Sequence, residues 1–158
     1  MKSELGSIPE DNHGLWKDRK LKSLLFGDQN SPHVSKWVGF LRDAGVFVEV
    51  IGYGEGQAPD SYAYEKLKSR PGSSASIGAR IRAGMGDLGL ILLGSYDFLS
   101  IHFLNTRFAF YALICPRPVV LTCWGTDILV DLDRGSWMGR WIRKRALKKA
   151  RVITCDAA

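Results

Sequence analysis

The sequence predicts an α/β protein whose open, parallel sheet carries helices on both faces. Short apolar runs, several of them rich in β-branched residues, alternate along the 158 residues with longer amphipathic stretches. Continuous apolar runs are typical of strands that helices cover on both faces. The first strand, helix and second strand also make a unit of roughly thirty residues, and such units almost always fold right-handed with parallel strands.

The predicted elements begin after a loose leader at residues 1–20. In chain order they are a strand at 21–27, a helix at 33–44, a strand at 46–51, a glycine-rich loop at 52–61, a short element at 62–68, a helix at 73–93, a strand at 97–103, a helix at 106–114, a strand at 119–123, a helix at 137–149 and a strand that starts at 151. We expect residues 21–158 to form a single Rossmann-like domain, because 46% hydrophobic and 24% charged side chains suit one compact core.

Local signals justify the first strand–helix–strand unit. The run LKSLLFG is apolar, and VFVEVI is β-branched. Between them, Ser31 is a favourable N-cap, Pro32 suits the first helical position and Gly45 is a typical helix stop. These signals place the two strands side by side, with the helix crossing between them.

The middle of the chain gives weaker signals. Gly52, Gly54 and Gly56 form a G-x-G-x-G pattern, but no clear helix opens after it, so we interpret it as a flexible loop and not as a dinucleotide fingerprint. Further glycines leave the bounds of the helix at 73–93 open.

The second half repeats the alternation more clearly. DFLSIHF reads as a buried strand, the next helix stops before Pro116, and PVVLTC supplies the strand that follows. Ser136 then caps a basic helix.

The charge and cysteine content narrow the class of protein. A net charge of +6 permits an anionic partner. Cys115, Cys123 and Cys155 have no metal-ligating spacing, so we expect neither a disulfide framework nor a metal site. The polar N-terminus lacks the apolar core of a signal peptide, and polar residues break the apolar stretch at 88–104. These features predict a cytoplasmic protein.

Polar side chains follow the predicted strands where ligands bind in open α/β sheets, beyond the carboxyl ends. The expected substrate-binding residues are Asn30, Ser31, His33, Asn105, Trp124, Gly125, Thr126 and Asp127. Each type also has a structural explanation, since Ser31 caps a helix, Gly125 permits a tight turn and Trp124 packs on a neighbouring helix. Both explanations stay open at this point.

His102 ends the buried strand at 97–103 and is the candidate catalytic residue. An imidazole there can bind a sugar hydroxyl or phosphate, or act as an acid or base near pH 7. The alternative is a histidine whose hydrogen bonds are satisfied in the core.

The helix at 137–149 is the strongest charge feature, with Trp137 and Trp141 one turn apart. The cations expected to form an anion or membrane patch are Arg140, Arg143, Lys144 and Lys148. Basic helices with tryptophan bind anionic membranes. The alternative is a surface helix that packs its tryptophans on the sheet. Nucleic acid is not an expected partner, because no nucleic-acid-binding motif accompanies the charge.

Three stretches together resemble a known family: LLFGDQNSPHVSKWVGFLRDAGVFVEVIGYG, DFLSIHFLNT, and PVVLTCWGTDI followed by RALKKARVITCDAA. In this order and spacing they resemble the N-terminal, acceptor-side half of GT-B glycosyltransferases, specifically the family 4-like domain. The resemblance covers residues 21–158. The opening loop departs from the family, since it has Asn30, Ser31 and Pro32 where paired glycines are common.

The resemblance implies retaining transfer of a sugar from a nucleotide-sugar donor to a glycan or lipid-linked acceptor, with no metal or other cofactor. His102 would lie by the transferred sugar, residues 28–33 near the donor diphosphate or the acceptor, and residues 125–127 along the acceptor. The donor would bind mainly to a C-terminal domain that this chain lacks. We therefore expect the chain alone to be inactive, as a fragment, as the product of a truncated reading frame, or as one partner of a split enzyme whose other chain carries the C-terminal domain. The basic helix at 137–149 adds the expectation of peripheral binding on the inner face of the membrane.

Two other hypotheses compete with this one. The first is a non-catalytic binding or membrane-docking module that uses the helix at 137–149. The second is a small flavodoxin-like nucleotide binder, which is disfavoured because no phosphate loop follows the first strand.

Overall fold

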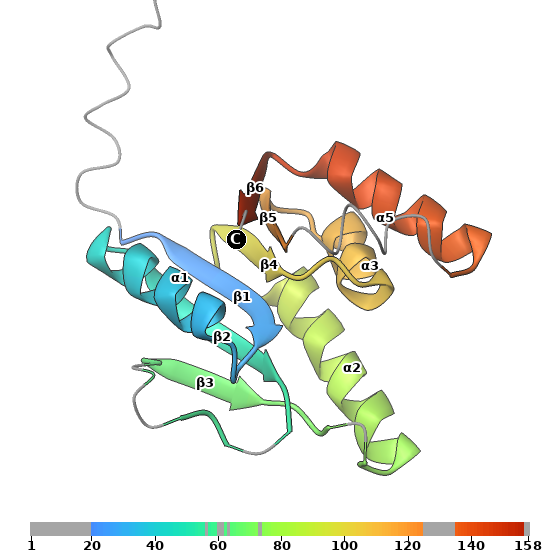
Figure 1. The fold of residues 1–158 in the computed structure, drawn as a ribbon, viewed down its shortest axis with the longest axis horizontal. Helices are drawn as coiled ribbons and strands as arrows, with labels where there is room; N and C mark the ends of the chain where they lie inside the picture. The colour runs from blue at the N-terminus through green and yellow to red at the C-terminus, as the bar shows by residue number, and fades with distance from the viewer. Residues whose placement is uncertain are drawn as a thin grey trace, which may run out of the picture.

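A computed structural model describes residues 20–55, 57–59, 62, 64–72, 74–124 and 135–156. In chain order its elements are β1 (Lys22–Asp28), α1 (Pro32–Asp43), β2 (Phe47–Tyr53), β3 (Lys66–Ser69), α2 (Ile77–Leu93), β4 (Phe98–His102), α3 (Thr106–Ile114), β5 (Val119–Trp124), α5 (Trp137–Lys149) and β6 (Val152–Asp156). Figure 1 shows these elements as a twisted sheet with helices packed around it. No helix in the described residues is long and apolar enough to cross a bilayer.

The six strands form one sheet in the order β3-β2-β1-β4-β5-β6, and every neighbouring pair is parallel. The predicted Rossmann-like fold class is therefore confirmed. The strand order reverses between β1 and β4, where Leu24 lies beside Leu99. In open α/β sheets a ligand crevice lies beyond the carboxyl ends of the strands at such a reversal.

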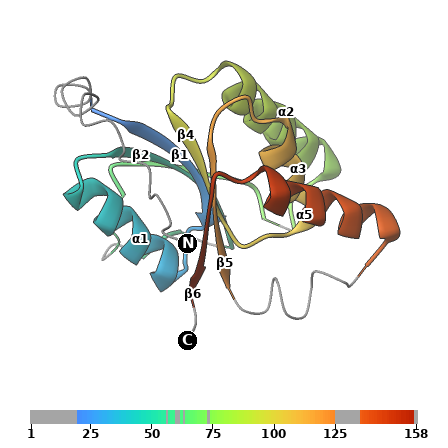
Figure 2. The ribbon, with the colours of Figure 1, turned by 90° about the horizontal axis from the view of Figure 1, so that it is seen from above.

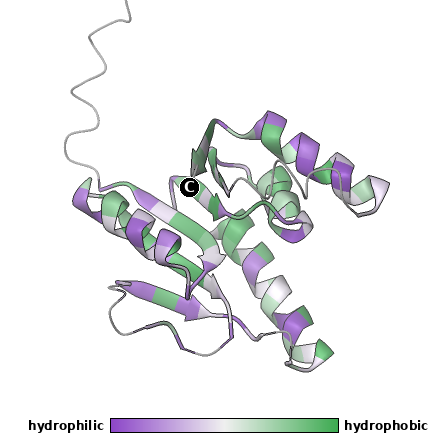
Figure 3. Cartoon of the chain, in the orientation of Figure 1, coloured by the Kyte–Doolittle hydropathy of each residue, from purple (hydrophilic) through white to green (hydrophobic). Residues whose placement is uncertain are grey.

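Helices cover both faces of the sheet, as expected, but unequally. Figure 2 shows α1 on one face and α2, α3 and α5 on the other. Alternate residues of β1 serve the two layers: Leu25 packs with Val34 and Val38 of α1, whereas Leu24 and Phe26 belong to the larger core under the other three helices. The middle of β1 is accordingly hydrophobic in Figure 3.

Two local features differ from the sequence-based predictions. The short element at 62–68 proves to be partly strand, because Lys66–Ser69 pairs with residues 49–52 as β3. Gly52, predicted in a flexible loop, lies inside β2. A Cβ there would lie 2.3 Å from Gln29 Oε1 and 2.7 Å from Gln29 Cβ, so this glycine makes room for the turn after β1.

Candidate functional site

The carboxyl ends of four strands enclose a crevice of about 320 Å3 at the strand-order reversal. We call it the strand-end crevice; its lining residues are Asp28, Tyr53, His102, Phe103, Asn105, Arg107, Phe108 and Trp124. The sequence predicted three of these, His102, Asn105 and Trp124, from their positions after strands. The crevice therefore lies where the topology predicts a ligand.

The turn between β1 and α1 is held rigidly beside this crevice. The backbone N–H of Asn30 donates to Asp28 Oδ1 at 2.9 Å, and Asn30 Nδ2 donates to the carbonyl of Glu55 at 2.8 Å. Gly54 permits the approach, since a Cβ there would lie 2.8 Å from Asp28 Oδ1. The turn is thus fixed by the Asp28 side chain and by the loop after β2.

Two buried oxygens in this turn make no hydrogen bond within the described residues: Asn30 Oδ1 and Ser31 Oγ. Ser31 occupies the N-cap position, as predicted, but its side chain makes no capping hydrogen bond. Buried polar atoms nearly always have a partner, so such atoms beside a crevice are candidates to contact a ligand.

His102 lies at the carboxyl end of β4 and is only 1% exposed. Its ring contacts that of Trp37 at 5.7 Å in an edge-on arrangement. It lines both the strand-end crevice and a second hollow of about 270 Å3 on the α1 side of the sheet. Phe103, the next residue, has a φ of 75°, a strained conformation for an aromatic residue that is common beside functional sites.

Aromatic rings form one wall of the crevice. Trp124 lies 5.2 Å from His33 and 5.9 Å from Phe103 between ring centroids. His33 itself is exposed and lines the hollow on the α1 side. The structure therefore brings these two predicted residues together. Trp124 packs against other rings at the crevice and not only against a helix.

Asn105 has a clear structural task. Its side-chain oxygen accepts a hydrogen bond from the backbone N–H of Phe108 at 2.9 Å and so caps α3. It lines the crevice as well. The remaining predicted residues, Gly125, Thr126 and Asp127, lie outside the described residues.

Sequence reasoning missed Tyr53 and Arg107, which line the crevice from β2 and α3. The guanidinium carbon of Arg107 lies 5.1 Å from the centre of the Tyr53 ring. The sequence does contain one signal that could have identified each of these two residues. Tyr53 ends a strand, and Arg107 lies in the first turn of a helix, where the dipole disfavours a cation unless an anion binds there.

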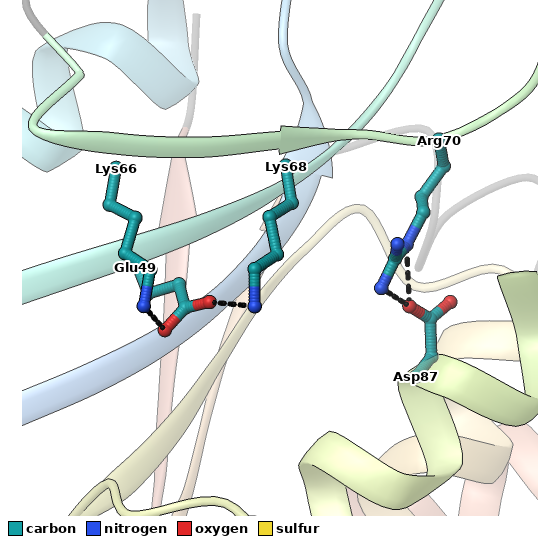
Figure 4. A network of polar contacts seen from close by, with 5 residues as sticks. All are labelled: Glu49, Lys66, Lys68, Arg70 and Asp87. Carbon is teal, nitrogen blue, oxygen red and sulfur yellow. Dashed lines mark hydrogen bonds and ion pairs between the residues drawn. The ribbon is translucent and has the colours of Figure 1, made fainter.

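Beneath Tyr53, a buried carboxylate joins three elements. Asp87 of α2 is fully buried and pairs with Arg70, whose Nη2 lies 2.6 Å from Asp87 Oδ1 (Figure 4). Tyr53 and Tyr111 donate their hydroxyls to the other oxygen of Asp87. Burial and the hydrogen bond to Asp87 raise the pKa of Tyr53 far above its usual value of 10.0. Tyr53 therefore stays protonated and fixed as a wall of the crevice.

The basic helix α5 exposes its aromatic residues instead of packing them on the sheet. Trp137 is 73% exposed and Trp141 50% exposed. Lys144 and Lys148 are also exposed, and the spacing of these four residues places them on one stripe. Figure 3 shows hydrophilic bands along this helix.

Two of the predicted patch cations are engaged elsewhere. Arg143 is buried, and its Nη1 donates to Thr106 Oγ1 at 2.7 Å, which ties α5 to the start of α3. It therefore does not belong to the exposed patch. Arg140 is half-buried and donates to the carbonyl of Gly135 at 3.1 Å. Within the described residues, no cluster of side chains is suited to hold a metal ion.

The comparison with known families agrees with this fold. A family described as glycosyl transferase 4-like matches residues 22–157. No curated protein matches the sequence. Among solved structures, the chain is similar to the apo-structure of 2-octenoyl-CoA carboxylase reductase CinF from Streptomyces sp., with 10% identity and a TM-score of 0.46. That match covers 82% of this chain and 32% of the other, so the chain spans about a third of that protein's length.

Proposed function

Because the chain belongs to the glycosyl transferase 4-like family, we propose that it is the acceptor-side domain of a retaining glycosyltransferase. Family membership supports a function of the glycosyltransferase type. The finer claim is that the chain binds a glycan or lipid-linked acceptor, to which a sugar is transferred from a nucleotide-sugar donor.

The strand-end crevice is the observation that carries this proposal. It has carboxylate, imidazole and guanidinium groups around an aromatic wall, from Asp28, His102, Arg107 and Trp124. Such a set suits a sugar, because rings pack on the apolar faces of the pyranose while the polar groups hydrogen-bond to its hydroxyls. The buried oxygens of Asn30 and Ser31 lie in the turn that follows Asp28, next to the crevice, although neither residue lines it.

In this proposal His102 lies beside the transferred sugar, and Asp28 or Asp127 binds an acceptor hydroxyl. The donor nucleotide binds mainly to a second domain, either further along the chain or on a separate chain. Closing the two domains would exclude water from the crevice and strengthen its electrostatic interactions, which retaining transfer requires. No metal or organic cofactor takes part.

The test is transfer of radiolabelled sugar in membranes of the native cells, where any donor-binding partner is present. A panel of nucleotide-sugar donors is supplied, and lipid-extractable and glycan products are counted with and without the gene for this chain. We expect one product to vanish when the gene is removed and to return when it is restored. An unchanged set of products would overturn the proposal.

A specific observation favours membrane docking as a second function. Trp137 and Trp141 are exposed on the same stripe of α5 as Lys144 and Lys148. Tryptophan enters the headgroup region of a bilayer, and each lysine adds attraction to anionic lipid. Peripheral binding on the inner face of the membrane would bring a lipid-linked acceptor to the crevice.

Sedimentation with anionic and neutral vesicles tests this docking. Each basic residue near an anionic surface contributes about 1 kcal/mol, so Lys144→Ala/Lys148→Ala should lower partitioning onto anionic vesicles about thirtyfold. Trp137→Ser/Trp141→Ser should lower binding as well. Lys36→Ala/Lys66→Ala removes the same charge elsewhere and serves as the control. Equal loss in both lysine pairs would mean that net charge, and not α5, drives binding.

A further inference from the structure

A groove of about 470 Å3 runs between α2 and α3. The two helices lie side by side on the same face of the sheet in Figures 1 and 2 and are in contact. One wall is a stripe of α2 at helical spacing: Ile77, Ile81, Gly84 and Leu88. The volume falls within the usual range of about 300–1,000 Å3 for small-molecule sites.

Exposed apolar side chains line much of this groove. Ile77 is 74% exposed and Ile81 59% exposed, and Phe110 of α3 is exposed opposite them. Large aliphatic side chains that gather on a surface mark a binding site more often than single exposed ones do. At Gly84 a Cβ would meet nothing within 4 Å, so this glycine leaves the groove floor open.

Two arginines connect the groove to neighbouring hollows. Arg80 and Arg107 line both the groove and a neighbouring cleft of about 250 Å3, and Arg107 also lines the strand-end crevice. In the described part of the chain, neither guanidinium forms an ion pair. Each lies in the first turn of its helix, α2 or α3, so helix dipoles add to the positive potential.

We propose that the groove between α2 and α3 binds the hydrocarbon chain of an anionic lipid-linked acceptor, and that Arg80 and Arg107 bind the phosphate that joins this chain to the acceptor sugar. The inference rests on the proposed function and names its substrate class. Charge complementarity selects the occupant: the apolar stripe suits a hydrocarbon chain, and the paired guanidinium groups suit a phosphate. Because Arg107 also faces the crevice, a phosphate held there places the attached sugar beside His102.

Calorimetric titration of the purified chain with dodecyl phosphate, kept below its critical micelle concentration, tests this site. Gly84→Phe fills the groove, whereas Gly89→Phe makes the same change at a position of α2 that does not line it and is equally free of neighbours. We expect Gly84→Phe to weaken binding at least about tenfold and Gly89→Phe to leave it unchanged. Unchanged binding in Gly84→Phe overturns the proposal.

Two further comparisons separate the contribution of the arginines from that of the ligand's hydrocarbon chain. Arg80→Glu should weaken binding of dodecyl phosphate about tenfold or more, and Arg82→Glu, an exposed arginine outside the groove, should not. Dodecanol and inorganic phosphate should each bind far more weakly than dodecyl phosphate. Equal binding of dodecanol would overturn the role of the arginines, and equal binding of inorganic phosphate would overturn the role of the groove.

These titrations need neither donor nor transfer, so they fail or succeed independently of the proposed function. Dodecyl phosphate binding without any gene-dependent transfer would refute the glycosyltransferase proposal and leave the lipid site standing. Gene-dependent transfer with no binding difference between Gly84→Phe and Gly89→Phe would refute the groove and leave the enzyme standing.

Discussion

Replacing the buried carboxylate of Asp87 should destabilise the fold far more than replacing the carboxylate of Glu49. Both acids pair with bases on or just after β3 (Figure 4). Asp87 is fully buried, whereas the lysines that bind Glu49 are more than a third exposed. Asp87→Asn leaves the Arg70 guanidinium without its anion and weakens the hydrogen bonds from two tyrosines. Losing one partner of a buried ion pair lowers the free energy of unfolding by about 3–5 kcal/mol.

Because asparagine keeps one of the two acceptor oxygens, we take the lower end of this range, about 3 kcal/mol. Glu49→Gln loses two ion pairs with exposed lysines, and at about 0.5 kcal/mol for each pair the loss amounts to about 1 kcal/mol. With a urea m-value of about 2 kcal/mol/M, the denaturation midpoint should fall by about 1.5 M for Asp87→Asn and by about 0.5 M or less for Glu49→Gln. Arg70→Gln/Asp87→Asn should be less destabilised than the sum of its single variants. Equal shifts for Asp87→Asn and Glu49→Gln would refute the reasoning.

Three further predictions concern stability. Burial alone would raise the pKa of Glu49, but hydrogen bonds and charge from two lysines outweigh burial and hold the pKa below 4.5. The stability lost in Glu49→Gln should therefore be seen above pH 4.5 and should vanish as the pH falls through the folded-state pKa of Glu49. Urea titrations of both proteins at several pH values measure this difference. Gly52→Ala should cost about 1–3 kcal/mol of unfolding free energy because of its overlap with Gln29, while Gly89→Ala in open space should gain up to about 1 kcal/mol. Asn105→Ala should cost about 1 kcal/mol through the lost cap of α3, measured by thermal melting, and an unchanged melting temperature would contradict that role.

Local sequence signals predicted most elements, because strands and helices here follow their own apolar patterns and caps. The helices at 106–114 and 137–149 begin and end as predicted. Strand β3 was harder to predict, since KLKS carries two lysines and forms a strand only through pairing with β2 and the ion pairs to Glu49. A long-range partner decided that element.

The candidate site was partly predictable for the same reason. Strand ends converge in a parallel sheet, so the positions of His102 and Trp124 followed from counting strands. The meeting of Tyr53 with Arg107 depends on the strand order and on a buried network around Asp87, which no local pattern reveals. Likewise, Arg143 belongs to a basic run, but packing against α3 buries it against Thr106.

The most direct test of the acceptor-domain account is sugar transfer by the intact enzyme carrying His102→Gln. The matched control is Ser100→Ala, a buried polar residue two positions earlier on the same strand, which bonds to Ser23 away from the crevice. Acid–base or positioning groups typically contribute about a hundredfold or more, so we predict at least a hundredfold loss of transfer for His102→Gln, with near wild-type transfer for Ser100→Ala. Wild-type transfer by a folded His102→Gln enzyme would contradict the account.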